Sequence, residues 1–91
     1  MAVVAVKIKV LPESPEVNLQ KMKEEIEVSL IKAGAVKINS IVEEPIAFGL
    51  KALIVFFAWP EQHDTSIAED AIKKIPHVSS EEIIDYRRAF G

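Results

Sequence analysis

Side chains that commonly carry out chemistry are few in this sequence and form no familiar catalytic pattern. His63 and His77 lie in different predicted loops, and the chain has no cysteine, so the closely spaced ligands of a zinc site are missing. Ser79 and Ser80 lack the context of a nucleophile elbow. The three glycines form neither a dinucleotide-binding turn nor a P-loop. We therefore expect no catalytic residue, no metal site and no cofactor, and we interpret the protein as a non-enzyme.

Charged residues gather in the last predicted strand. We interpret the carboxylates Glu81, Glu82 and Asp85 as solvated residues at a sheet edge, since no pocket is evident that would shift their pKa values. Arg87 and Arg88 are the only arginines in the chain, and they are adjacent. Arginine at a strand end is often solvated charge, but its planar guanidinium also binds carboxylates and phosphates bidentately. Their clustering favours a binding role.

Residues 45–49 read Pro-Ile-Ala-Phe-Gly and form a predicted loop with an aromatic residue at its turn. Phe48 has two interpretations. It can fold back as a lid on the core, as large apolar side chains commonly do. It can also project as an anchor into a pocket of a partner.

Composition limits the function classes. The 91 residues are 49% apolar and carry a net charge of −3, which argues against a dedicated nucleic-acid-binding protein. No run approaches the ~18 apolar residues of a membrane span. We expect one domain, residues 1–91, that acts in the cytoplasm without direct contact with nucleic acid or membrane.

The hydrophobic pattern predicts six elements. Alternation or a continuous apolar run predicts strands, and three- and four-residue spacing of apolar residues predicts helices. Asn18 and Gly34 are expected caps of the first helix, either Asp64 or Thr65 begins the second, and Pro76 ends it. The predicted elements are a strand at 2–11, a helix at 19–33, strands at 36–43 and 50–59, a helix ending before 76, and a strand at 78–88.

The order β-α-β-β-α-β indicates a ferredoxin-like α+β sandwich, with a four-stranded antiparallel sheet and two helices on one face. In the strand at 36–43, simple alternation sets Ile38 and Val42 on one side. The open face of the sheet should show Ala5, Ile41 and one alternating half of residues 53–59. This partly apolar face is a candidate surface for a partner or for weak self-association.

Three segments give the chain a resemblance to the elongation factor 1-beta family of archaea and to the exchange domain of its eukaryotic counterpart. They are residues 8–15 (IKVLPESP), 43–50 (EEPIAFGL), and the C-terminal residues 77–80 and 85–88 (HVSS and DYRR). The segments follow the family's order and spacing over nearly the whole chain, and the central loop is the most specific of them.

The resemblance implies a guanine-nucleotide exchange factor that binds elongation factor 1-alpha and speeds exchange of GDP for GTP. In the family a loop aromatic presses into the GTPase beside its nucleotide site, and Phe48, flanked by Ile46, Ala47 and Gly49, matches it. A basic residue near the C-terminus reaches the magnesium site. The eukaryotic proteins use lysine there, whereas this chain offers Arg88 or Arg87.

Two other function classes share this fold. A small-molecule-binding regulatory module would need a glycine-rich or polar loop after the first strand, and residues 12–15 (PESP) supply a poor one. A structural interaction domain would use the open sheet face and would be indifferent to Phe48.

Overall fold

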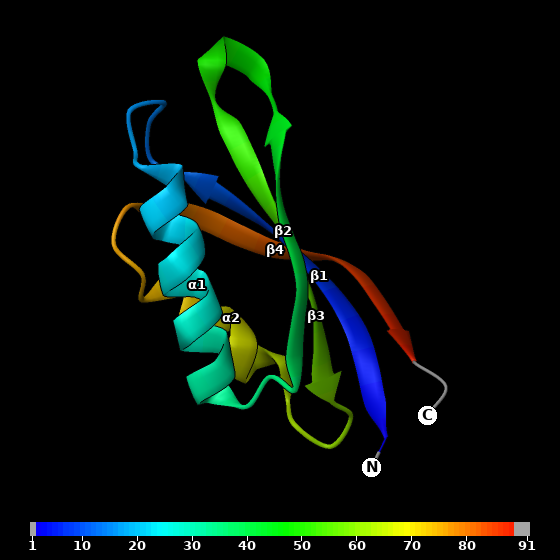
Figure 1. The fold of residues 1–91 in the computed structure, drawn as a ribbon. Helices are drawn as coiled ribbons and strands as arrows, with labels where there is room; N and C mark the ends of the chain where they lie inside the picture. The colour runs from blue at the N-terminus through cyan, green and yellow to red at the C-terminus, as the bar shows by residue number, and fades with distance from the viewer. Residues whose placement is uncertain (1, 89–91) are drawn as a thin grey trace.

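The computed structural model describes residues 2–88, which form one sheet and two α-helices (Figure 1). The predicted order β-α-β-β-α-β is confirmed, and the boundaries lie within two residues of those expected. The elements are β1 (Val3–Pro12), α1 (Leu19–Ala33), β2 (Lys37–Pro45), η1 (Ala47–Gly49, one 3-10 turn), β3 (Lys51–Pro60), α2 (Thr65–Lys73) and β4 (Val78–Arg88).

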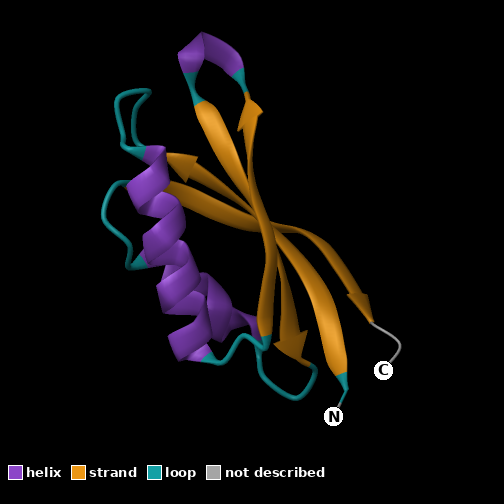
Figure 2. Cartoon of the chain, viewed as in Figure 1, coloured by secondary structure: helices purple, strands orange, loops and turns teal. Residues whose placement is uncertain are grey.

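The sheet has the order β2-β3-β1-β4, and each neighbouring pair is antiparallel. The central strands are therefore β1 and β3, while β2 and β4 form the edges. Both helices lie on the same face of the sheet (Figures 1 and 2). This arrangement is the ferredoxin-like sandwich expected from the hydrophobic pattern.

The core lies between the helices and the inner face of the sheet. Alternate residues of β1 are buried and the residues between them are half-exposed, as period-two alternation requires. Facing residues of β3 pair with them in register, for example Val6 with Phe57. The buried side chains are Val4, Val6, Ile8 and Val10 of β1, Met22, Ile26 and Leu30 of α1, Leu53, Val55, Phe57 and Trp59 of β3, Ala68 and Ile72 of α2, and Ala35 and Ile75 of the loops.

The helix ends agree with the sequence signals. The side chain of Asn18 accepts a hydrogen bond from the backbone of Lys21 at 3.1 Å and so satisfies a free N–H group of the first turn. Gly34 follows α1 with a φ of 124°, which glycine adopts without steric cost. Asp64, one of the two residues considered, caps α2 by accepting from the backbone of Ser66 at 2.9 Å.

A β-bulge in β2 overturns one part of the predicted sheet. The register against β3 shifts after Ile38 because Asn39 is an extra residue. Beyond the bulge, Ile41 packs against the core, while Val42 pairs with Ile54 of β3 and is exposed. The placement of Ile41 on the open face, and of Val42 on the same side as Ile38, was therefore wrong.

The open face is otherwise as expected. Ala5 lies opposite Ala58, and the non-core half of β3 contributes Ile54 and Phe56. The ammonium group of Lys7 lies 5.3 Å from the centre of the Phe56 ring, a cation–π geometry. Ile54 is only 9% exposed, so neighbouring side chains already cover much of the apolar surface on this face.

Candidate functional site

The tip of the β2–β3 hairpin is closed by its own backbone. The N–H of Ile46 donates to the carbonyl of Leu50 at 2.9 Å, and the N–H of Leu50 donates to the carbonyl of Ala47 at 3.2 Å. Between these bonds Phe48 has φ 61° and ψ 33°, and Gly49 has φ 76°. Two successive residues thus adopt left-handed backbone, which explains the glycine at 49.

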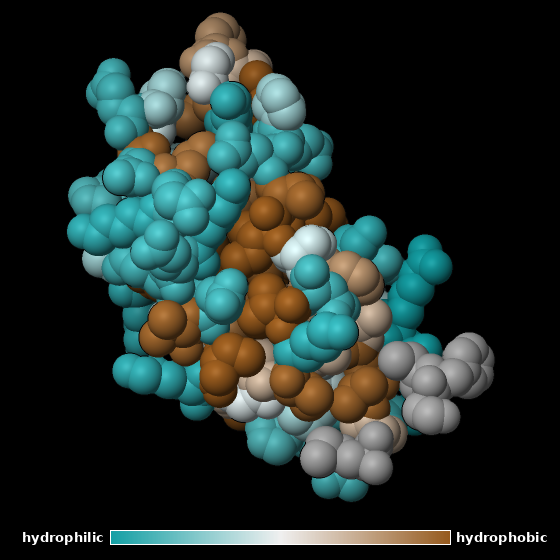
Figure 3. Space-filling model, viewed as in Figure 1, coloured by the Kyte–Doolittle hydropathy of each residue, from teal (hydrophilic) through white to brown (hydrophobic). Residues whose placement is uncertain are grey.

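Phe48 does not fold back on the core. Its side chain is 95% exposed, so the lid interpretation was wrong. The left-handed backbone costs an L-residue about 1–2 kcal/mol, and the exposed ring recovers none of this by burial within the chain. Figure 3 shows apolar surface at this tip, which projects beyond the rest of the molecule. A strained and fully exposed aromatic is suited to contact with another molecule.

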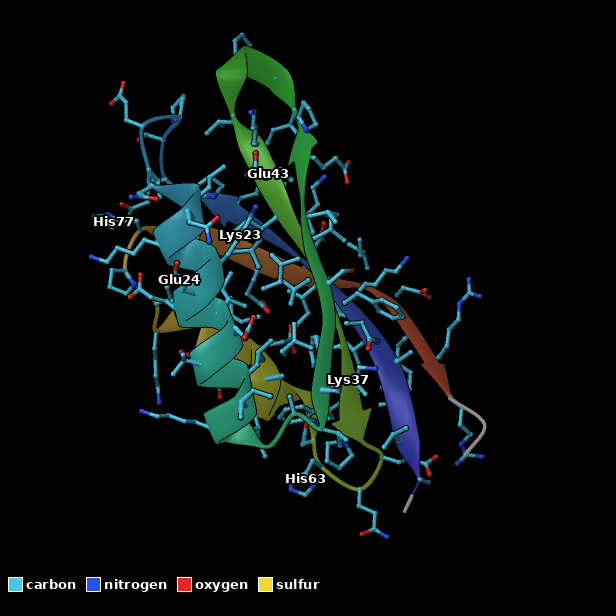
Figure 4. All side chains as sticks on the ribbon, in the orientation of Figure 1. Lys23, Glu24, Lys37, Glu43, His63 and His77 are labelled. Carbon is cyan, nitrogen blue, oxygen red and sulfur yellow. The ribbon has the colours of Figure 1, made fainter. Side chains whose placement is uncertain are left out.

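One ion pair joins the hairpin to α1, and a second lies within the hairpin. The carboxylate of Glu43 on β2 lies 3.0 Å from the ammonium group of Lys23 on α1 (Figure 4). It also lies 3.6 Å from the ammonium group of Lys51 on β3. Hydrogen bonding and the charge of Lys23 hold the pKa of Glu43 below its usual range, so the pair stays ionised at neutral pH. The pair with Lys23 is the contact that links the hairpin to the helical layer.

A groove runs beneath the tip toward the last residues of β1 and the first residues of β4. It includes Ile46 and Ala47, the loop residues expected to accompany Phe48. The full lining is Lys9, Leu11, Ile46, Ala47, Phe48, Leu50, Ser80, Glu81 and Glu82.

The two arginines at the end of β4 point to opposite sides of the sheet. Arg87 pairs with Ala5 on the open face, and its Nε donates to the carboxylate of Asp85, on the same strand, at 3.3 Å. Arg88 pairs with Val4, a core position, and its Nε and Nη2 both contact Oε1 of Glu61, in the turn after β3. Both guanidinium groups remain largely exposed.

The hairpin tip and the arginines are not brought together. Arg88 lies at the level of Val4, which pairs with Trp59 of β3, whereas the tip begins at Lys51. At ~3.3 Å per residue, that length of β3 spans about 26 Å. Figure 1 shows the tip and the described end of β4 at opposite ends of a molecule whose longest extent is 41 Å. If both groups contact one partner, their contacts therefore lie about 26 Å apart on it.

The other candidate chemical residues remain dispersed. His63 and His77 lie at opposite ends of the helical layer (Figure 4), and Nδ1 of His77 contacts Glu13 at 3.2 Å. Within residues 2–88, no cluster of three or more histidine, aspartate or glutamate side chains has the geometry to hold a metal ion. No helix in the described part of the chain has the length and apolarity needed to cross a membrane.

Glu81 is not the solvated edge residue that the sequence suggested. Although β4 is an edge strand, Glu81 pairs with Val10, and its side chain faces α2, where Glu69, Asp70 and Lys73 lie. Its Oε1 is buried and accepts no hydrogen bond from any described residue. Burial, followed by the effect of the Glu69 carboxyl, raises the pKa of Glu81 to about 7.

Sequence reasoning also missed Glu61. This residue lies in a polar turn and contacts a residue 27 positions away, so no local pattern marks it. Only the topology, which sets β1 between β3 and β4, brings the two chain segments near one another.

Comparison with known proteins gives a consistent result. The family of the EF-1 guanine nucleotide exchange domain matches residues 5–88. A protein of Methanosarcina barkeri named elongation factor 1-beta is 46% identical over 89 residues, which cover 97% of this chain and 99% of that protein. Proteins of the same name from Methanocaldococcus jannaschii and Nanoarchaeum equitans are 41% and 42% identical, over 93% and 90% of this chain and 96% and 100% of their own lengths.

Proposed function

This chain belongs to the elongation factor 1-beta family, and from that membership we propose that it promotes exchange of GDP for GTP on elongation factor 1-alpha. The observation that carries the proposal is Phe48, a strained aromatic residue with a 95% exposed side chain at the tip of a braced hairpin. It is the expected form of an interface anchor, because a rigid aromatic loses little conformational entropy on binding.

The two ends of the molecule have different roles in this proposal. Phe48, with Ile46, Ala47 and Gly49 around it, anchors the factor to the GTPase. The arginines at the other end act at the nucleotide site, where a bound magnesium ion would be among the largest local charges. A guanidinium there would pair with carboxylate or phosphate groups that otherwise hold the metal, and nucleotide binding would weaken.

The separation of the ends supports a two-point contact. A span of about 26 Å between tip and arginines is longer than a guanine nucleotide, so the anchor occupies a second surface of the GTPase. Linkage then requires reciprocity: a factor that weakens nucleotide binding is itself bound less tightly when nucleotide is present.

The test is release of fluorescent GDP from elongation factor 1-alpha, with the factor at sub-stoichiometric concentration. We expect acceleration with turnover by the unmodified protein. Phe48→Ala should lower the rate of GDP release roughly 30-fold when the concentration of the exchange factor is limiting. This is the effect of losing about 2 kcal/mol of binding free energy at an interface anchor. Its folding stability should change by less than about 1 kcal/mol, because the ring is not packed within the chain.

Two variants sharpen this test. Phe48→Asn removes the ring but keeps a residue that tolerates left-handed backbone, so a matching loss of exchange assigns the effect to the aromatic. Val28→Ala trims another exposed apolar side chain, on α1, and should leave exchange unchanged. Full activity of both Phe48 variants would refute the anchor, and absence of any acceleration by the unmodified protein would refute the function.

A further inference from the structure

We propose that Glu61 is a positioning residue for nucleotide exchange, and that it acts by holding Arg88 across the first residues of β1. The inference rests on the proposed exchange function and assigns the nucleotide-site role to Arg88 rather than Arg87. It starts from the contact of Nε and Nη2 of Arg88 with Oε1 of Glu61.

Hydrogen bonds fix the backbone around Glu61. Its backbone N–H donates to the carbonyl of Ala2 at 3.1 Å, and two residues later the N–H of His63 donates to the carbonyl of Pro60 at 3.1 Å. The turn after β3 is thus closed on itself and fastened to the start of β1. Glu61 is the more buried partner of the ion pair, since 25% of its side chain is exposed, against 78% for Arg88.

The contact leaves Arg88 able to bind a second acceptor. A guanidinium has five N–H donors, and the contact with Glu61 uses the edge formed by Nε and Nη2. The outer edge stays in solvent and can donate to a carboxylate or phosphate of the partner. Because an exposed ion pair adds little to folding stability, the consequence of this pair is orientation of a long, flexible side chain.

Among the residues that the structure describes, Arg87 has no such support from another element. Its carboxylate partner, Asp85, is two residues away on the same strand, so that pair fixes the guanidinium only relative to β4 itself. Arg88 is held by a different element, and its direction is therefore defined relative to the body of the sheet.

The first test is the maximal rate of GDP release at saturating factor. Glu61→Gln should lower this rate roughly three- to tenfold, the effect of ordering one long side chain, with little change in the half-saturating concentration. Arg88→Gln should lower it at least as much, and adding Glu61→Gln to Arg88→Gln should have no further effect. Glu27→Gln removes an exposed carboxylate from α1 and serves as the matched control.

A second readout needs no GTPase. The chain has two arginines, so a ¹⁵N spectrum of the intact protein should contain two Nε–Hε signals. Glu61→Gln should shift one signal, assigned to Arg88, and leave that of Arg87 in place. If Glu61→Gln acted by destabilising the whole fold, its urea unfolding midpoint would be lower than that of the unmodified protein.

Several results would overturn the proposal. If Glu61→Gln lowered the maximal rate of GDP release equally in the unmodified protein and in Arg88→Gln, Glu61 would act independently of Arg88. If Glu61→Gln alone made GDP release faster, the contact would restrain Arg88 from acting. An unshifted Nε–Hε signal would exclude the contact in solution. These results are distinct from a failure of the proposed exchange function, in which the unmodified protein would not accelerate GDP release at all.

Discussion

Replacing Glu81 by glutamine should remove a pH dependence from the stability of the fold. Glu81 lies under α2 beside Glu69 and Asp70, and its buried Oε1 has no hydrogen-bond partner within residues 2–88. Lys73 is the neighbouring group in that range whose charge opposes the rise in the pKa of Glu81. The raised pKa, about 7 in place of 4.5, means that the folded protein retains a proton that the unfolded chain releases. Because Glu69 shares the site, this proton belongs to the pair of carboxyls.

The sign and size follow from linkage. Between pH 4.5 and about 7 the unfolded chain binds fewer protons than the folded one, so the free energy of unfolding falls as pH rises and levels off above 7. A shift from 4.5 to about 7 corresponds to at most about 3 kcal/mol. Since the side chain is only half-buried, solvent screening reduces this to roughly 1–2 kcal/mol.

Urea unfolding followed by fluorescence of Trp59, the single tryptophan, measures the effect. Glu81→Gln should match the unmodified protein at pH 5 and exceed it by about 1–2 kcal/mol at pH 8, because glutamine stays neutral in both states. Glu82→Gln, one residue along the strand, controls for loss of a negative charge from β4. A difference between Glu81→Gln and the unmodified protein that is the same at pH 5 and pH 8 would refute the reasoning.

Two further substitutions test the local geometry. Gly49→Ala should lower the free energy of unfolding in urea by about 1 kcal/mol, because a φ of 76° is unfavourable for alanine. Space is not the cause, since no described residue other than the two chain neighbours lies within 4 Å of the added Cβ. An unchanged urea midpoint would mean that the tip relaxes freely. Asn18→Ala should cost about 1 kcal/mol by removing the cap of α1, whereas Asn18→Ser should retain most of the stability; equal losses in the two variants would exclude the cap hydrogen bond as the cause.

The parts of the fold predicted from sequence are those set by local pattern. β1 has one buried face and α1 one buried stripe, so periods of two and 3.6 appear directly in the residues. Asn18 and Gly34 mark the ends of α1 because capping involves residues only three or four positions apart.

The failures come from interactions between distant segments. An extra residue at Asn39 reverses the faces of β2 beyond it, and only the pairing with β3 reveals this. Glu81 appeared solvated because its sequence neighbours are polar, whereas its environment is set by α2. The exposure of Phe48 depends on two consecutive left-handed residues, of which only Gly49 had a sequence signal.

The resemblance named Phe48 and the arginines as candidate site residues, and their roles stay a prediction. Their separation could not be predicted, because it follows from the antiparallel register, which sets Arg88 at the level of Trp59 rather than of Lys51. The residue that contacts Arg88 had no signal, because Glu61 and Arg88 meet across β1.

This separation makes the sheet part of the proposed mechanism. β3 runs from the hairpin tip to the turn that carries Glu61, and it is hydrogen-bonded on both sides, by β2 and β1. Such a strand cannot change length without breaking its ladders, so it fixes the distance between anchor and arginine. A GTPase that engages Phe48 therefore receives Arg88 at one distance and in one direction.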